Sequence, residues 1–172
     1  DRAEPEEVQD VLETYFADAA KAIFSQDGVI DKYMGDGILA FFENDGDQIT
    51  SAVRAVDCAL TMQARARELN ELYRSQNRSS FSIRVGLTTG YAKVGNIGPA
   101  EKIDYTVIGS VVNLASRLQG IGEPGDVIID EDTYFFVKDH YLVTDLGPKD
   151  LKGFSKSIEV FSVTAREQAV AS

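Results

Sequence analysis

The sequence contains very little cysteine and no long apolar run. Its one cysteine, Cys58, excludes an internal disulfide and suits a reducing compartment. Cys58 lies within a helical apolar pattern, which predicts an inert buried thiol, with a reactive thiol as the alternative. No apolar run approaches the length of a membrane span, and the first residues lack the features of a secretory signal. We therefore expect no membrane contact from this segment. The expected location is cytoplasmic, or the cytoplasmic face of a membrane if the full-length protein is anchored.

Basic residues are also scarce. The 172 residues include 17 Lys and Arg against 28 Asp and Glu, a formal net charge of −11. Because affinity for nucleic acid depends on clustered lysine and arginine, this balance argues against a nucleic-acid partner. It does not exclude a phosphorylated small molecule, since a triphosphate carried as its magnesium complex needs only a few local cations in a cleft.

The sequence has one histidine, His140, and no Gly-x-Ser-x-Gly pattern around a nucleophilic serine. We expect His140 to lie at the surface or at a strand end, with a catalytic base as the alternative. A reaction catalysed by this chain would therefore proceed without a strong nucleophile from the protein.

The apolar pattern predicts one α+β domain. Apolar residues recur at helical spacing after Pro5 until a break at 26–28, and a second helical stripe begins at Ile49. A further helix is expected at 111–118, and strands are expected at 29–34, 38–42, 82–88, 91–95, 102–108, 126–129, 141–145 and 158–163. The first two strands, and the next two, are predicted to form hairpins. Helices that alternate with hairpins favour a ferredoxin-like sandwich, with helices packed on a mostly antiparallel sheet.

The first predicted hairpin carries charged residues at unusual places. Side-chain alternation along the strand puts Lys32 on one face with Ile30 and Met34, and points Asp31 to the other face. Asp36 lies between two glycines in the predicted turn. Two plainer interpretations stay open, because lysine suits an edge strand and aspartate is a favourable turn residue.

A second pattern lies on the predicted helix at 111–118. Asn113 and Arg117 are four residues apart, so both side chains project from one face, beside an apolar face formed by Leu114 and Leu118. Arginine offers a planar, permanently charged fork that suits a phosphate undergoing reaction. An ordinary exposed polar helix face is the alternative.

In combination, these motifs resemble the catalytic domain of the class III nucleotide cyclases, which make cyclic AMP or cyclic GMP. The resemblance rests first on Lys32, four residues before Asp36. It rests also on the segment Asp-Tyr-Thr-Val-Ile-Gly at 104–109 and on the pair Asn113 and Arg117, all in the order and spacing of that family.

Two further segments are similar to the same family. The glycine-rich stretch at 86–98 looks like the hairpin between the motifs, and Leu-Lys-Gly-Phe-Ser-Lys at 151–156 resembles a phosphate-binding lysine segment. The resemblance implies that Lys152 would hold the terminal phosphates of the substrate. It makes residues 1–165 the catalytic domain. Residues 166–172 lack an apolar face, so we expect them to form a frayed tail.

The resemblance also implies roles for the residues of the main motifs. Asp36 would be a metal ligand. Lys32 and Thr106 would select the base, and this lysine–threonine pair is similar to the adenylyl type. Asn113 would orient the ribose, and Arg117 would stabilise charge on the reacting phosphorus.

The implied reaction converts ATP to 3′,5′-cyclic AMP and pyrophosphate. The ribose 3′-hydroxyl would attack the α-phosphorus in line, with two Mg²⁺ or Mn²⁺ ions per site as cofactors. In the family each site lies between two protomers, so the resemblance implies a homodimer with composite sites. A regulatory domain is expected elsewhere in the full-length chain.

The family's domain opens with a strand of the type Phe-x-Asp-Ile, whose aspartate is the other metal ligand. The given sequence begins after that strand, so we expect the strand upstream of Asp1, with loss of the ligand as the alternative. Strand alternation predicts that Asp31 cannot replace it, because Asp31 would point away from Lys32.

The sequence leaves other functions open. A non-catalytic cyclase-like module could bind nucleotide or dimerise as a regulator, and a guanylyl cyclase would share most of the motifs. A generic ferredoxin-like interaction domain would leave the conjunction of motifs unexplained.

Overall fold

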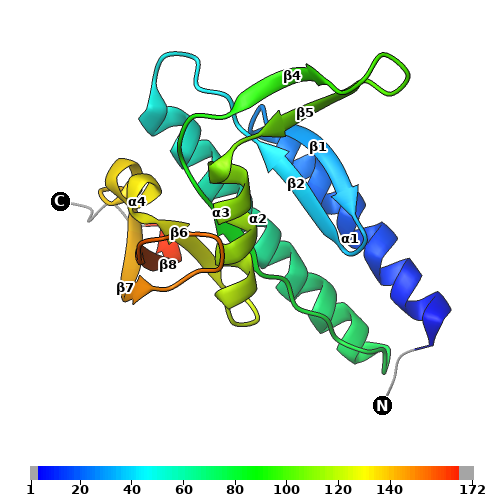
Figure 1. The fold of residues 1–172 in the computed structure, drawn as a ribbon. Coiled ribbons are helices and arrows are strands. Elements are labelled where there is room, and N and C mark those ends of the chain that lie inside the picture. The colour runs from blue at the N-terminus through cyan, green and yellow to red at the C-terminus, as the bar shows by residue number, and fades with distance from the viewer. Residues whose placement is uncertain (1–3, 167–172) are drawn as a thin grey trace.

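The computed structural model describes residues 4–166 (Figure 1). In chain order the elements are α1 (Pro5–Ser25), β1 (Val29–Met34), β2 (Gly37–Phe41), α2 (Gln48–Ser75), β3 (Val85–Leu87), β4 (Lys93–Ile97), β5 (Asp104–Ile108), α3 (Ser110–Ile121), β6 (Val127–Asp130), α4 (Glu131–Val137), β7 (Tyr141–Lys149) and β8 (Ile158–Arg166). The expected α+β class is confirmed. None of the helices in this range has the length and apolar composition needed to cross a lipid bilayer.

The strands form a four-stranded sheet and two antiparallel ribbons. The sheet has the order β3-β6-β8-β7, with β3 and β6 parallel, and the ribbons are β1-β2 and β4-β5. The predicted hairpin between 82–88 and 91–95 is therefore wrong. The chain after β3 does not turn back to pair with β3. The Thr88 hydroxyl donates to the carbonyl of Val111, and the hydroxyls of Thr89 and Thr133 form a hydrogen bond with each other.

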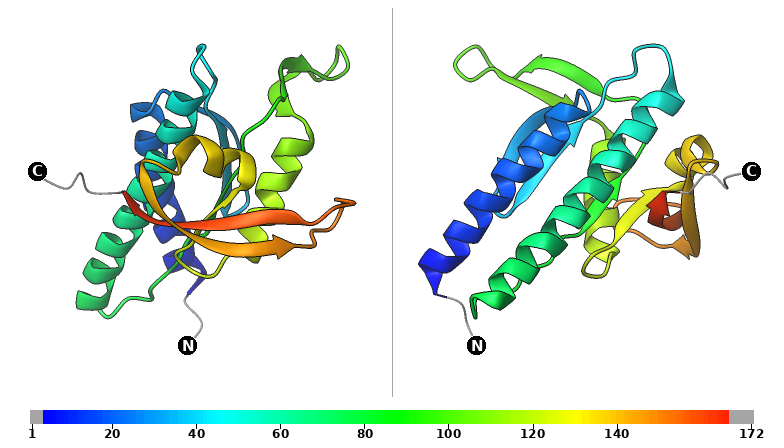
Figure 2. Two further views of the ribbon diagram at one scale, coloured as in Figure 1. Left: turned by 90° about the vertical axis from the view of Figure 1, so that its left-hand side faces the viewer. Right: turned by 180° about the vertical axis from the view of Figure 1, so that it is seen from behind.

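Two helical layers cover the four-stranded sheet. Val127 and Ile129 of β6 pack with α2, whereas Ile128 packs with Leu118 of α3 on the opposite side. Burial on both faces explains why β6 is apolar at successive positions. Figure 2 shows α1 and α2 side by side on the face of the molecule away from α3.

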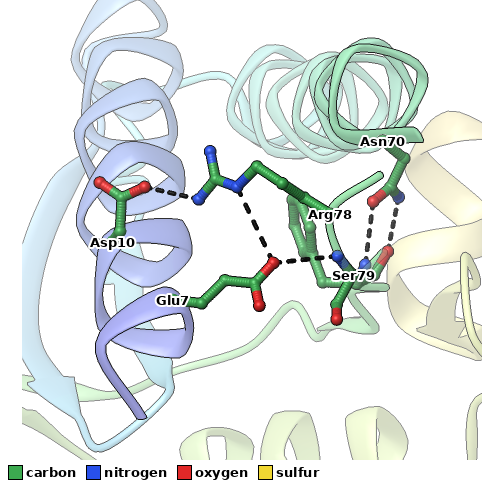
Figure 3. A network of polar contacts seen from close by, with 6 residues as sticks. Glu7, Asp10, Asn70, Arg78 and Ser79 are labelled. Carbon is green, nitrogen blue, oxygen red and sulfur yellow. Dashed lines mark hydrogen bonds and ion pairs between the residues drawn. The ribbon is translucent and has the colours of Figure 1, made fainter. Parts of the chain in front are cut away.

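A polar network ties the start of α1 to the chain after α2 (Figure 3). Arg78 pairs with Asp10 at 2.6 Å and lies 3.8 Å from Glu7, and its guanidinium stacks over the Tyr73 ring at 4.4 Å. The amide of Ser79 donates to the same Glu7 carboxylate at 3.0 Å. These contacts join the two long helices at one end, beside the apolar cluster that contains Val11 and Tyr73.

The end of the described chain is also ordered by pairing. Arg166, which the sequence assigns to the tail, is the last residue of β8 and forms an ion pair with Asp57 at 2.8 Å. Residues 167–172 lie outside the described part of the chain. His140 directly precedes β7 and is half-buried, as expected for a strand-end histidine.

Candidate active site

Lys32 lies in β1, and its surroundings depend on an irregularity in that strand. Ile30 pairs with Ala40 and Lys32 pairs with Leu39, so Asp31 is an extra residue that forms a β-bulge. The bulge interrupts the alternation of side chains. Asp31 consequently lies beside Lys32, with 3.9 Å between its Oδ2 and the lysine Nζ. The prediction that Asp31 points away from Lys32 is therefore wrong.

Asp31 also contacts β5, which runs next to β1. The Thr106 hydroxyl donates to Oδ2 of Asp31 at 2.8 Å, across 75 positions of sequence, and the amide of Val107 lies 3.5 Å from the same oxygen. The Asp31 side chain is 1% exposed, whereas that of Lys32 is 50% exposed and Thr106 is 8% exposed. The fold thus brings together Lys32 and Thr106, as their predicted common role requires.

Asp36 lies at the tip of the β1-β2 hairpin. Gly35 has a φ of +60°, and Asp36 keeps a negative φ, which is the pattern of a two-residue type II′ turn. The turn predicted from sequence is confirmed, and the Asp36 side chain is exposed. Among residues 4–166 no group of three His, Cys, Asp or Glu residues could hold a metal ion. Because Mg²⁺ favours six oxygen ligands, Asp36 alone does not make a metal site.

Asn113 and Arg117 lie on α3 as predicted, on a face beside the one that packs on the sheet. Leu114 and Leu118 are buried in the core cluster, while Asn113 and Arg117 are both exposed. Arg117 forms no ion pair in the described part of the chain. Its guanidinium is therefore free to meet a ligand.

Lys152 lies in the turn between β7 and β8. Leu151 is buried in the core and anchors this turn, and Lys152 itself is exposed. Within 4–166 no hydrogen bond or ion pair joins Lys152, Asp36 and Arg117 to one another. Within the described residues Lys32 and Thr106 meet at Asp31, whereas no hydrogen bond or ion pair joins the other four predicted residues to them.

A groove of about 450 Å³ separates the β1-β2 ribbon from the four-stranded sheet. Leu39 and Phe41 of β2 line one wall, and Gly86 and Leu87 of β3 line the other. Among the described strands, β2 pairs only with β1 and β3 pairs only with β6. Both strands therefore present a free edge near the groove.

The comparisons with known proteins agree with this architecture. Residues 1–165 match the family described as the adenylate and guanylate cyclase catalytic domain. Adenylate cyclase 1 of Rhizobium meliloti is 31% identical over 168 residues, which are 96% of this chain and 25% of that protein. The chain thus spans a quarter of the length of this curated relative.

Two solved structures have the same fold. The adenylyl cyclase CyaB from P. aeruginosa is 35% identical, with a TM-score of 0.90 over 97% of this chain and 87% of that chain. The guanylyl cyclase Cya2 is 32% identical, with a TM-score of 0.86 over 98% of this chain and 85% of that chain. The chain therefore belongs to the family of adenylate and guanylate cyclase catalytic domains.

Proposed function

We propose that this chain is the catalytic domain of an adenylyl cyclase, which converts ATP to 3′,5′-cyclic AMP and pyrophosphate. The observation that carries the proposal is the meeting of Lys32 and Thr106 around the Asp31 carboxylate. The similarity to proteins named adenylate cyclase supports the same activity. We expect catalysis in the cytoplasm or at the cytoplasmic face of a membrane, where ATP is present.

The exposed residues of α3 serve the reacting end of the substrate in this proposal. The Asn113 side-chain amide forms a hydrogen bond with the ribose. This bond orients the 3′-hydroxyl toward the α-phosphorus, in line with the leaving pyrophosphate. Arg117 donates a forked pair of hydrogen bonds to the phosphate oxygens on which charge develops. Lys152 binds the terminal phosphates. Holding the reacting groups in this geometry supplies much of the rate acceleration without a protein nucleophile.

Asp36 is one carboxylate of the proposed metal site, for two Mg²⁺ or Mn²⁺ ions. Bound divalent ions would lower the pKa of the ribose 3′-hydroxyl of ATP and neutralise negative charge on the triphosphate. The free edges of β2 and β3 beside the groove support the proposal that a further strand, from a segment upstream of Asp1, pairs with them and supplies a second carboxylate.

We propose that two copies of the chain complete the site. Within residues 4–166 no hydrogen bond or ion pair joins Asp36, Arg117 and Lys152. This agrees with a site in which one protomer supplies the metal ligand and the other supplies the base-selecting and phosphate-binding residues. Large apolar side chains are exposed along β1 and β5, the strands that carry Lys32 and Thr106. They include Tyr33, Met34 and Tyr105. A regulatory domain elsewhere in the full-length protein would control how the two copies meet.

The test is the formation of cyclic AMP from ATP by the full-length protein, with Mg²⁺ or Mn²⁺. If the protein is dimeric and forms no cyclic nucleotide, that result would contradict the proposed cyclase activity and favour a regulatory module. A guanylyl cyclase is the second candidate, because Cya2 shares the fold at 32% identity. A preference for GTP over ATP in direct competition would favour the guanylyl cyclase. In that case Lys32→Glu should raise the preference for GTP rather than reverse it.

A further inference from the structure

Asp31 is a buried carboxylate at the point where β1 meets β5. Its side chain is 1% exposed, and a β-bulge turns it toward Lys32 and Thr106. A buried charge requires polar partners, and Asp31 has the Thr106 hydroxyl at 2.8 Å and the Lys32 ammonium at 3.9 Å. None of the roles assigned above to the neighbouring residues explains why a carboxylate stands there.

The bond between Asp31 and Thr106 has a fixed direction. A hydroxyl has one hydrogen to donate and two lone pairs that accept, whereas an ionised carboxylate only accepts. The Thr106 hydrogen is therefore committed to Asp31, and the Thr106 oxygen can offer only lone pairs to a ligand. Lys32 is the converse, since an ammonium group donates and never accepts.

We propose that Asp31 is a positioning residue that sets the hydrogen-bonding polarity of the base pocket and thereby selects adenine. This inference rests on the proposed function. Adenine presents a donor, its 6-amino group, beside an acceptor, N1. The amino group donates to the Thr106 oxygen, and N1 accepts from Lys32, so both edges match.

Guanine presents the reverse pattern at the same two positions. Its O6 accepts, so it faces the lone pairs of Thr106, and its N1–H donates, so it faces the Lys32 ammonium. A site whose polar groups are fixed rejects such a ligand strongly, because those groups are left unpaired. Without Asp31 the Thr106 hydroxyl could rotate and donate to O6, and the discrimination would weaken.

The test compares ATP with GTP as substrates of the full-length protein carrying Asp31→Ala, which removes the acceptor of the Thr106 hydrogen. We expect the ratio of kcat/KM for ATP over that for GTP to fall by about tenfold or more. Thr106→Val should lower the ratio too, and Asp31→Ala should have no further effect in the Thr106→Val background, because Asp31 acts through the hydroxyl. Asp18→Ala is the matched control, since it removes a carboxylate of α1 that accepts from Arg65 of α2 at 2.7 Å.

The wild-type protein gives a second measurement that does not depend on the variant folding. Inosine triphosphate has guanine's O6 and N1–H but no 2-amino group, so it should compete with ATP as poorly as GTP does. Additive effects of Asp31→Ala and Thr106→Val, or an ATP-like affinity for inosine triphosphate, would overturn the inference alone. A wild-type protein that neither binds nor cyclises ATP would overturn the proposed function and the inference with it.

Discussion

Gly86 of β3 lies directly against Ala115 of α3, with no room for a side chain between the two backbones. A Cβ at Gly86 would overlap the carbonyl oxygen of Ala115 and would lie 2.5 Å from the amide nitrogen of Gln119. Because α3 carries Asn113 and Arg117, this contact sets the height of the proposed catalytic side chains above the sheet.

Gly86→Ala should lower the free energy of unfolding by about 2–3 kcal/mol, since backbone atoms on both sides must move to accept one methyl group. Chemical denaturation measures the change. Gly120→Ala on α3 is the control, because no atom lies within 4 Å of the Cβ that this substitution adds. That control should gain about 0.5–1 kcal/mol from helix propensity. Equal effects at the two positions would show that the contact is loose.

Local patterns account for the parts of the fold that the sequence predicts well. Pro5 begins α1 as expected, the Gly35 turn forms, and the spacing of Asn113 and Arg117 places both on the exposed face of α3. Each of these depends on contacts between residues close together in the chain. The catalytic roles of the exposed residues remain predictions.

The features that the sequence does not predict depend on distant contacts. The bulge at Asp31 reverses the orientation expected from alternation, and its partner Thr106 is 75 positions away. Parallel pairing of β3 with β6 likewise has no local signal. The short helix α4 was also missed, although Asp130 caps it by accepting from the amide of Thr133. Burial raises the pKa of that Asp130 carboxyl.

Cys58 should be unreactive in the folded protein. Burial raises the pKa of its thiol to about 11, so roughly a thousandth is thiolate at pH 8. We expect slow maleimide labelling of the tryptic peptide 55–65 in the native protein and fast labelling in urea. The native rate should rise about tenfold per pH unit below that pKa. Rapid labelling at pH 7 without denaturant would mean that the α2 core opens readily.

Asp36→Asn tests the proposed metal ligand. Asparagine also suits the turn, so the hairpin should persist while the negative charge is lost. Cyclic AMP formation by the full-length protein should fall by about 100-fold or more, and Mn²⁺ affinity measured by calorimetry should weaken in parallel. Asp45→Asn, in the exposed loop after β2, should change neither quantity. Unaltered Mn²⁺ affinity would remove Asp36 from the metal site.

Arg117→Ala tests the proposed charge stabilisation. The side chain is exposed, beside the buried face of α3, so its loss should leave the melting temperature within about 1–2 °C of wild type. Turnover should fall by about 100- to 1,000-fold, the usual loss for a group that stabilises developing charge. Arg74→Ala, near the exposed end of α2, is the control. Parallel losses of stability and activity would instead indicate a structural role.

The composite site can be tested by combining two inactive variants. If each site takes Asp36 from one protomer and Arg117 from its partner, a heterodimer of Asp36→Asn and Arg117→Ala has one intact site and one doubly altered site. Random pairing makes half of the dimers heterodimers, so co-expression of the two full-length variants should restore about a quarter of wild-type activity. A site built within one protomer would give no such recovery, because every chain in the mixture lacks one of the two groups. Purification through two different affinity tags isolates the heterodimer, whose turnover should then approach half that of wild type.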